Sequence, residues 1–97
     1  MAKPHFFGKA LRRVRMARGM TQEDFSTTSG RTYISQLERG ERGATLAKIA
    51  ELAEAMGVHP LTLVALAFAD SQETLRKLLA EVGNEATSLM RSAPPAE

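Results

Sequence analysis

The chain contains no cysteine among its 97 residues. It therefore has no disulfide, no thiolate metal ligand and no cysteine nucleophile, a composition that fits a reducing cytosol. No apolar run approaches the ~18–20 residues that a membrane-spanning helix needs. The N-terminal residues also lack the apolar segment of a secretory signal. We therefore expect a single small domain in the cytoplasm, with no membrane association.

Patterns of catalytic and metal-binding residues are also missing. His5 and His59 stand far apart in the sequence without a cluster of carboxylates around them, so they do not form a typical metal site. The hydroxyl residues 26–29 have no histidine placed to activate them. The chain has no glycine-rich phosphate loop. We therefore expect a protein that is not an enzyme and needs no cofactor.

The charges are unevenly distributed along the chain. Residues 1–20 contain six basic side chains and no acidic one, whereas residues 21–97 contain seven basic and eleven acidic side chains, a net charge of −4. A basic segment on an otherwise acidic body is typical of a protein that binds a polyanion, although a solvated helix face explains it equally well.

The hydrophobic spacing is helical throughout, with no pattern typical of strands. A first helix carries the stripe Phe7, Leu11 and Val14 and ends at Gly19. Further helices are expected at 22–28, capped by Thr21 with Asp24 at the third helical position, at 31–39, at 46–56 and at 61–68. The fourth of these five should begin at a Thr45 cap and turn Leu46, Ile49, Leu52, Ala53 and Met56 inward. A sixth helix starts at Asp70-Ser71, is broken or kinked at Gly83-Asn84 and continues over 85–91, and residues 92–97 form a frayed tail.

A short helix, a turn with glycine and a helix with one polar face together predict a helix-turn-helix motif. The helix at 31–39 keeps Ile34 and Leu37 inward and presents Arg31, Thr32, Ser35 and Gln36 outward. Arginine can bind guanine with two hydrogen bonds, glutamine can bind adenine, and threonine offers a methyl and a hydroxyl. The pattern therefore predicts a helix that reads the major groove of DNA.

Two runs carry a resemblance to a known family: residues 19–25, Gly-Met-Thr-Gln-Glu-Asp-Phe, and residues 31–40, Arg-Thr-Tyr-Ile-Ser-Gln-Leu-Glu-Arg-Gly. With the apolar pattern that follows them, they resemble the XRE-type helix-turn-helix family. This family includes phage Cro and repressor proteins and the controller proteins of restriction–modification systems. The resemblance covers about residues 7–64 and implies an all-α, phage-repressor-like bundle of five helices.

The resemblance also implies roles for individual residues. Gln22 and Arg42 match positions that contact phosphates, and Ser35 matches a position that meets a base or a phosphate. Arg31, Thr32 and Gln36 match positions that meet base edges. Arg15 and Glu38 match a structural salt bridge. The full set of expected DNA-binding residues is Gln22, Arg31, Thr32, Tyr33, Ser35, Gln36, Arg39 and Arg42.

The interval between Gln22 and Ile34 is shorter than is usual in this family, and the shortening falls around residues 28–30. We therefore expect a shortened second helix or a tighter turn, with Thr28 or Ser29 capping the helix that follows. Ser26 replaces the usual alanine, which is a mild steric change.

Residues 1–69 are accordingly expected to form the DNA-binding domain, 70–91 a helical extension and 92–97 a disordered tail. The expected function is sequence-specific DNA binding that represses or autoregulates transcription. Surplus apolar residues in the fifth helix and the extension predict a homodimer that binds a palindromic operator. The alternative is that the extension folds back over the fifth helix within one monomer. Other functions left open are an antitoxin or restriction controller with the same DNA chemistry, and a protein-interaction adaptor with this fold.

Overall fold

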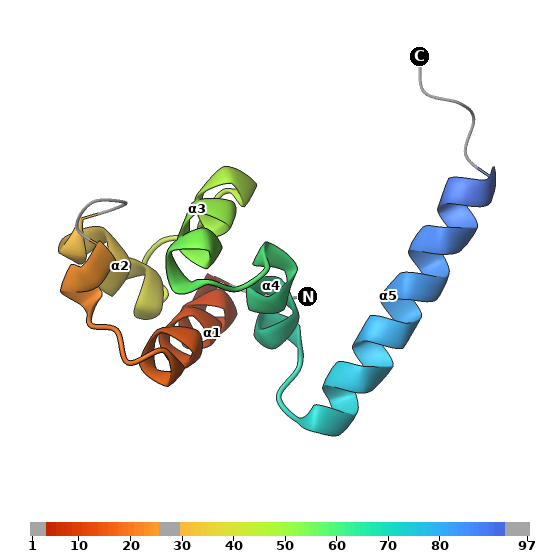
Figure 1. Cartoon of the computed structure of the whole chain (residues 1–97), viewed down its shortest axis with the longest axis horizontal. Coiled ribbons are helices and arrows are strands. Elements are labelled where there is room, and N and C mark those ends of the chain that lie inside the picture. The colour runs from red at the N-terminus through yellow and green to blue at the C-terminus, as the bar shows by residue number, and fades with distance from the viewer. Residues whose placement is uncertain (1–3, 26–29, 93–97) are drawn as a thin grey trace, which may run out of the picture.

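The computed structural model describes residues 4–25 and 30–92, with side chains from Phe7 onwards in the first helix. Every regular element in these residues is helical, as the sequence predicts. The elements in chain order are α1 (Pro4–Ala17), a 3₁₀ helix η1 (Gln22–Phe25), α2 (Arg31–Glu38), α3 (Leu46–Met56), α4 (Pro60–Phe68) and α5 (Gln72–Ser92). Figure 1 shows α1 to α4 packed together and α5 extending away from them.

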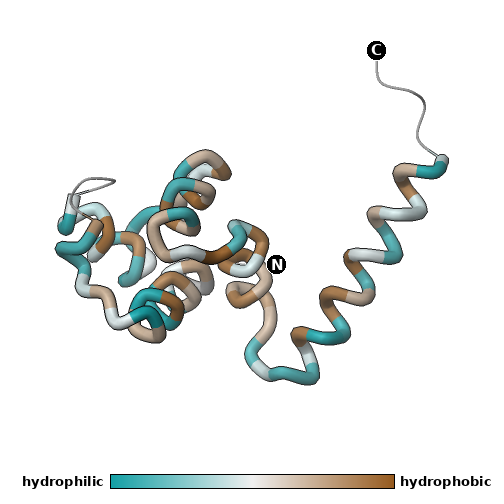
Figure 2. Tube along the Cα trace, in the orientation of Figure 1, coloured by the Kyte–Doolittle hydropathy of each residue, from teal (hydrophilic) through white to brown (hydrophobic). Residues whose placement is uncertain are grey.

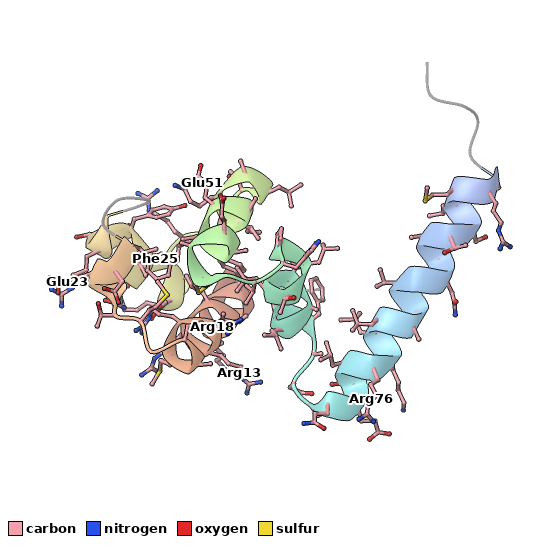
Figure 3. All side chains as sticks on the ribbon, in the orientation of Figure 1. Arg13, Arg18, Glu23, Phe25, Glu51 and Arg76 are labelled. Carbon is pink, nitrogen blue, oxygen red and sulfur yellow. The ribbon has the colours of Figure 1, made fainter. Side chains whose placement is uncertain are left out.

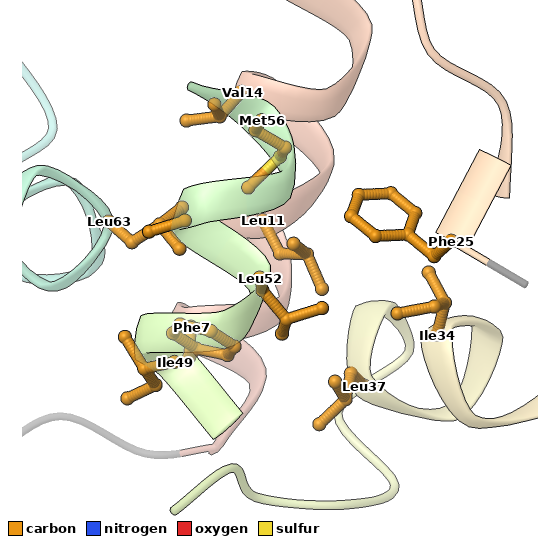
Figure 4. Packing of buried hydrophobic residues seen from close by; sticks show 11 residues of the cluster. Phe7, Leu11, Val14, Phe25, Ile34, Leu37, Ile49, Leu52, Met56 and Leu63 are labelled. Carbon is orange, nitrogen blue, oxygen red and sulfur yellow. The ribbon is translucent and has the colours of Figure 1, made fainter. Parts of the chain in front are cut away.

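The core lies between α1, η1, α2, α3 and α4. Side chains from all five elements meet there, and Figure 4 shows Phe25, Ile34 and Leu37 on one side of Leu11 and Leu52. Burial of each such side chain contributes roughly 1.5–3 kcal/mol, so this cluster is the main source of stability. Its members are Phe7, Leu11, Val14, Phe25, Ile34, Leu37, Ile49, Leu52, Ala53, Met56 and Leu63.

The contact between α1 and α2 depends on Gly8. A Cβ atom at this position would collide with the carbonyl oxygen of Leu37 and lie 2.8 Å from the carbonyl oxygen of Glu38. Glycine therefore lets α1 approach the backbone at the end of α2. As expected, α1 ends before Gly19, which has a positive φ of 67°.

The structure describes the second helix only over its first turn. Its described part is the single 3₁₀ turn η1, in which the Thr21 backbone N–H donates to Asp24 Oδ2 at 2.7 Å. This bond is the Asp24 half of the expected capping box. Residues 26–29, including Ser26 and the two expected caps Thr28 and Ser29, lie outside the described residues.

The residue at the N-cap of α2 is Gly30, which has no side chain that could cap the helix. Gly30 is the extended residue before the first helical turn, and the expected caps Thr28 and Ser29 lie outside the described residues.

Both ends of α3 are confirmed. The Thr45 hydroxyl accepts from the Lys48 N–H at 3.1 Å, and Gly57 ends the helix with a φ of 72°. The prediction that Leu46 faces inward is wrong, because its side chain is 82% exposed. Leu46 is the first helical residue, and the inward stripe of α3 begins only at Ile49.

The bounds of the last two helices, α4 and α5, differ in part from the predicted ones. α4 begins with Pro60 at its first helical position, one residue before the predicted start, and the Nδ1 atom of His59 accepts from the Leu61 N–H at 3.0 Å. α5 runs without interruption through Gly83 and Asn84 to Ser92, so the predicted break is wrong, and Ser92 belongs to the helix rather than to the tail. Residues 93–97 lie outside the described part of the chain.

α5 has no buried residue among its 21. It contacts α4 near their junction and then diverges from it, so the extension does not fold back to cover α4 (Figure 1). In Figure 2, α4 is hydrophobic over most of its length, whereas hydrophobic and hydrophilic residues alternate along α5. Among the described residues, no single helix is long and apolar enough to cross a membrane. Together, α3 and α4 are long and apolar enough to do so, but the two helices are bent by 107° relative to each other.

Candidate nucleic-acid interface

α2 is anchored by two buried residues and leaves a polar face open. Ile34 and Leu37 are fully buried, as predicted. Arg31 and Thr32, one turn or less from the helix start, are exposed, and Tyr33, Ser35 and Gln36 are half-buried. The helix thus presents hydrogen-bonding side chains near its N-terminus, where a recognition helix meets base edges.

The C-terminal end of α2 is fastened to α1 by an ion pair. Arg15 donates two hydrogen bonds to Glu38, from Nε to Oε2 at 2.6 Å and from Nη2 to Oε1 at 3.0 Å. The two side chains are only 12% and 5% exposed. The hydrogen bond to Glu38 raises the pKa of Arg15 above its ordinary value, against the opposing effect of burial.

Two further hydrogen bonds extend this pair. Arg15 Nη1 donates to the carbonyl oxygen of Met20 at 2.9 Å, and Gln22 Nε2 donates to Glu38 Oε1 at 3.1 Å. The amide of Gln22 is therefore oriented by Glu38 at the start of η1. The network joins α1, η1 and α2 and sets the position of the recognition helix relative to the core.

A second cluster surrounds Tyr33. The guanidinium of Arg42 lies 5.3 Å from the centre of the Tyr33 ring and donates from Nε to Gln36 Oε1 at 2.8 Å. Lys48 Nζ lies 5.5 Å from the same ring and pairs with Glu51 at 2.9 Å. Cations over an aromatic face are attracted by the ring quadrupole. The structure thus brings together three expected DNA-binding residues, and Arg42 fixes the orientation of the Gln36 amide.

Arg31 at the start of α2 and Arg39 directly after its end pair with acidic residues of this chain. Arg31 Nη1 lies 3.6 Å from Glu23 Oε2, with both side chains largely exposed. Arg39 donates to both carboxylate oxygens of Glu41, at 2.7 and 3.1 Å, and its Nη1 donates to the Ser35 hydroxyl. The hydrogen bond with Glu41 raises the pKa of Arg39, and the same bond lowers the pKa of Glu41.

Two arginines of the basic segment predicted at residues 1–20, Arg15 and Arg18, form hydrogen bonds within the chain. Arg15 is used internally, and Arg18 Nη2 donates to the carbonyl oxygen of Gly57 at 3.5 Å. Lys9 and Arg13 line a hollow of about 470 Å³ at the junction of α1, α4 and α5. Figure 3 shows Arg13 on the side of α1 away from η1, whereas Glu23 lies at the opposite edge of the molecule.

Sequence reasoning missed the roles of Glu23, Glu41 and Lys48. Glu41 comes back to Arg39 because Gly40, between them, has a positive φ of 76°. The sequence signal for the Arg39–Glu41 contact is Gly40 directly after Arg39, because a glycine at this position ends a helix and reverses the chain. Glu23 and Lys48 come from other elements, and their proximity to α2 depends on the tertiary fold.

Comparison with known proteins assigns the family. A profile described as helix-turn-helix matches residues 11–63, more than half of the chain. An uncharacterized HTH-type transcriptional regulator of Sinorhizobium fredii, y4dJ, is 42% identical over 59 residues, which cover 59% of this chain and 77% of that protein. The control protein C.BamHI of Bacillus amyloliquefaciens is 39% identical over 61 residues, covering 60% and 75%.

A solved structure agrees with these matches. The restriction-modification controller protein C.AhdI from Aeromonas hydrophila superposes with a TM-score of 0.57 at 39% identity, over 62% of this chain and 94% of that one. The matched residues 11–63 include η1 and α2, and α5 lies beyond them. The resemblance inferred from the sequence is confirmed, and the chain belongs to the helix-turn-helix family.

Proposed function

We propose that this protein is a DNA-binding transcriptional regulator that places α2 in the major groove. The observation that carries the proposal is the geometry of α2, a helix fastened by buried Ile34 and Leu37 and by the ion pair of Glu38, whose opposite face presents polar and basic side chains. A protein-interaction adaptor would more often expose apolar side chains on this face. The proposal involves no catalytic step, and the site of action is the DNA in the cytoplasm.

The residues divide into two groups by the DNA atoms they meet. Arg31, Thr32 and Gln36 read base edges near the helix start, and Arg42 and Gln22 hold phosphates on either side. Tyr33, Ser35 and Arg39 complete the contact surface. Because Arg42 donates to Gln36 Oε1, it also orients the amide that reads a base.

A homodimer through α4 and α5 is the second part of the proposal. α5 is about 30 Å long, yet it has no buried residue. Long helices in proteins are stabilised mainly by packing of an apolar face. Leu61 and Phe68 of α4 are likewise exposed. Between the two helices lies an apolar groove of about 230 Å³, lined by Leu61, Thr62, Ala65, Leu66, Leu75 and Leu79 together with His59.

The sequence of α5 favours a second copy of this helix as the partner. Five apolar residues recur at alternating spacings of four and three, the seam of paired helices: Leu75, Leu79, Val82, Ala86 and Leu89. Residues 72–79 carry Glu73, Arg76 and Lys77, a net charge of +1. Residues 80–92 carry Glu81, Glu85 and Arg91, a net charge of −1. In an antiparallel pair, residues 72–79 of one copy lie beside residues 80–92 of the other copy, so segments of opposite net charge face each other.

Residues 1–69 thus serve as the DNA-binding domain and 70–91 as the dimerisation extension. A two-fold dimer places its recognition helices about 34 Å apart, one turn of DNA, and therefore binds a palindromic operator.

Control of restriction–modification genes is the most specific role we propose. C.BamHI is named as a control protein and C.AhdI as a restriction-modification controller. Repression or autoregulation at such an operator follows from the same DNA chemistry.

Selection from a pool of randomised duplexes tests the function. The expected result is enrichment of one sequence with two inverted half-sites whose centres are about 10 base pairs apart. A pool that stays random after repeated rounds, although the folded protein is present, would contradict sequence-specific binding.

A further inference from the structure

Arg39 is held by Glu41 on the surface that the proposed function assigns to DNA. Its guanidinium gives Nε and Nη2 to the two oxygens of Glu41, and Nη1 to the Ser35 hydroxyl. The side chains of Arg39 and Glu41 are 56% and 52% exposed, so both are accessible to a ligand. Planar two-bond contacts of this kind are also the way arginine binds phosphate.

Glu41 is an acidic residue in the loop directly after α2, at the edge of the proposed DNA-binding surface. It follows directly after Gly40 and precedes Arg42, which is expected to contact a phosphate. The hydrogen bond from Arg39 lowers the pKa of Glu41, so the carboxylate is charged at neutral pH. A carboxylate here repels phosphates and occupies the arginine that would bind them.

We propose that Glu41 is a specificity-determining residue that competes with DNA phosphates for Arg39. The proposal rests on the proposed function, because it concerns the choice between operator and random DNA. Glu41 acts through Arg39 and is thus a positioning residue. Specificity of this type arises from an interaction that penalises the wrong partner.

The physical basis is the difference between loose and fixed docking. On random DNA, α2 makes only phosphate contacts, and a phosphate must displace Glu41 from Arg39 without help from other bonds. On the operator, base contacts hold α2 in one register, so that a phosphate stays next to Arg39 at high effective concentration. Glu41 therefore weakens binding to random DNA more than binding to the operator.

The test compares Glu41→Gln with the parent protein on the selected operator and on a scrambled duplex of equal length. We expect binding to the scrambled duplex to tighten about threefold to tenfold at low salt. Its log–log salt slope should steepen by about 1.8, the effect of one additional arginine–phosphate contact in each subunit of the dimer. Operator binding should change less, so the affinity ratio falls. Glu41→Asp keeps the charge and should retain most of the parental ratio.

Two controls separate Arg39 release from a change in net charge. Glu54→Gln on α3 removes the same charge from an exposed position away from α2 and should leave the affinity ratio unchanged. In an Arg39→Ala background, Glu41→Gln should tighten binding to the scrambled duplex clearly less than it does in the parent protein, because no arginine remains to be released.

Equal effects of Glu41→Gln and Glu54→Gln would overturn the proposal, as would weaker binding of Glu41→Gln to both duplexes. An undiminished effect of Glu41→Gln without Arg39 would also overturn it. A parent protein that binds neither duplex would contradict the proposed function itself. A parent that selects its operator while Glu41→Gln keeps the parental ratio would refute only the role of Glu41.

Discussion

Arg15 on α1 and Glu38 at the end of α2 form a two-bond ion pair that is almost enclosed by the protein, with N···O distances of 2.6 and 3.0 Å. Gln22 adds a third hydrogen bond to the same carboxylate. The pair and the bond from Gln22 therefore connect α2 to both α1 and η1. Loss of the pair would affect the position of α2 as well as the stability of the fold.

Replacement of Glu38 by alanine should destabilise the protein by about 3 kcal/mol, because Arg15 would remain enclosed without its carboxylate. For a domain of this size, such a loss lowers the melting temperature by roughly 10–20 °C. Thermal unfolding followed by circular dichroism measures the change. Glu54→Ala, at an exposed position of α3, is the matched control and should shift the melting temperature little. Identical melting curves for Glu38→Ala and the parent would show that the pair contributes nothing to stability.

Gly8 and Gly83 should respond in opposite directions to the same substitution. A Cβ atom at Gly8 meets the backbone oxygens of Leu37 and Glu38, whereas one at Gly83 in α5 meets nothing within 4 Å. Gly8→Ala should therefore cost about 3 kcal/mol through overpacking against α2. Gly83→Ala should stabilise the helix by about 0.5–1 kcal/mol. Urea unfolding of both variants checks this, and a Gly8→Ala protein as stable as Gly83→Ala would disprove the close approach of α1 to α2.

Gln36 and Arg42 should behave as a coupled pair in DNA binding. Gln36→Ala should cost roughly 1–3 kcal/mol on the operator and blur selectivity at one position per half-site. Arg42→Ala removes a phosphate contact and also frees the Gln36 amide. The double variant should therefore lose about 1 kcal/mol less than the sum of the single losses. Strictly additive losses would indicate that Arg42 does not orient Gln36.

Arg31 provides the comparison for this pair. It contacts Glu23 rather than Gln36 or Arg42, so Arg31→Ala should be additive with Arg42→Ala. Its cost on the operator should be roughly 1–3 kcal/mol, with a much smaller effect on random DNA. Equal losses on both DNAs would assign Arg31 to a phosphate instead of a base.

Dimerisation should depend on the apolar seam of α5. Leu79→Glu or Val82→Glu places a charge within the seam and should yield monomers in sedimentation experiments at micromolar concentration. Asn84→Glu adds the same charge to the opposite side of the helix and should leave the dimer intact. A parent protein that remains monomeric at high micromolar concentration would contradict the dimer.

Local signals predicted much of this fold. Thr45 and Gly57 bound α3 because a hydroxyl cap and a left-handed glycine act on adjacent backbone groups. The break predicted at Gly83 was wrong because one glycine costs a helix only about 1 kcal/mol, too little to end a long one. Leu46 was misplaced because the orientation of a first helical residue depends on where neighbouring elements end.

The candidate site was predictable to a similar degree. The resemblance implied the Arg15–Glu38 pair, which the structure contains. The contact of Arg39 with Glu41 had a signal in Gly40, which reverses the chain, but the contacts of Arg42 could not be predicted, because they depend on the packing of the loop against Tyr33.

The dependence of binding on salt tests the central claim most directly. Arg39 and Arg42 are the two cations of each subunit that the proposed interface places on phosphates, and a dimer supplies four. The log of the operator affinity should then fall against the log of salt concentration with a slope of about −4. Fluorescence anisotropy measures this slope in a titration from about 50 to 200 mM salt, a range over which affinity that depends on phosphate contacts falls steeply. A slope near −4 with preference for the operator is the predicted result, and a slope near zero would contradict DNA as the partner of this protein.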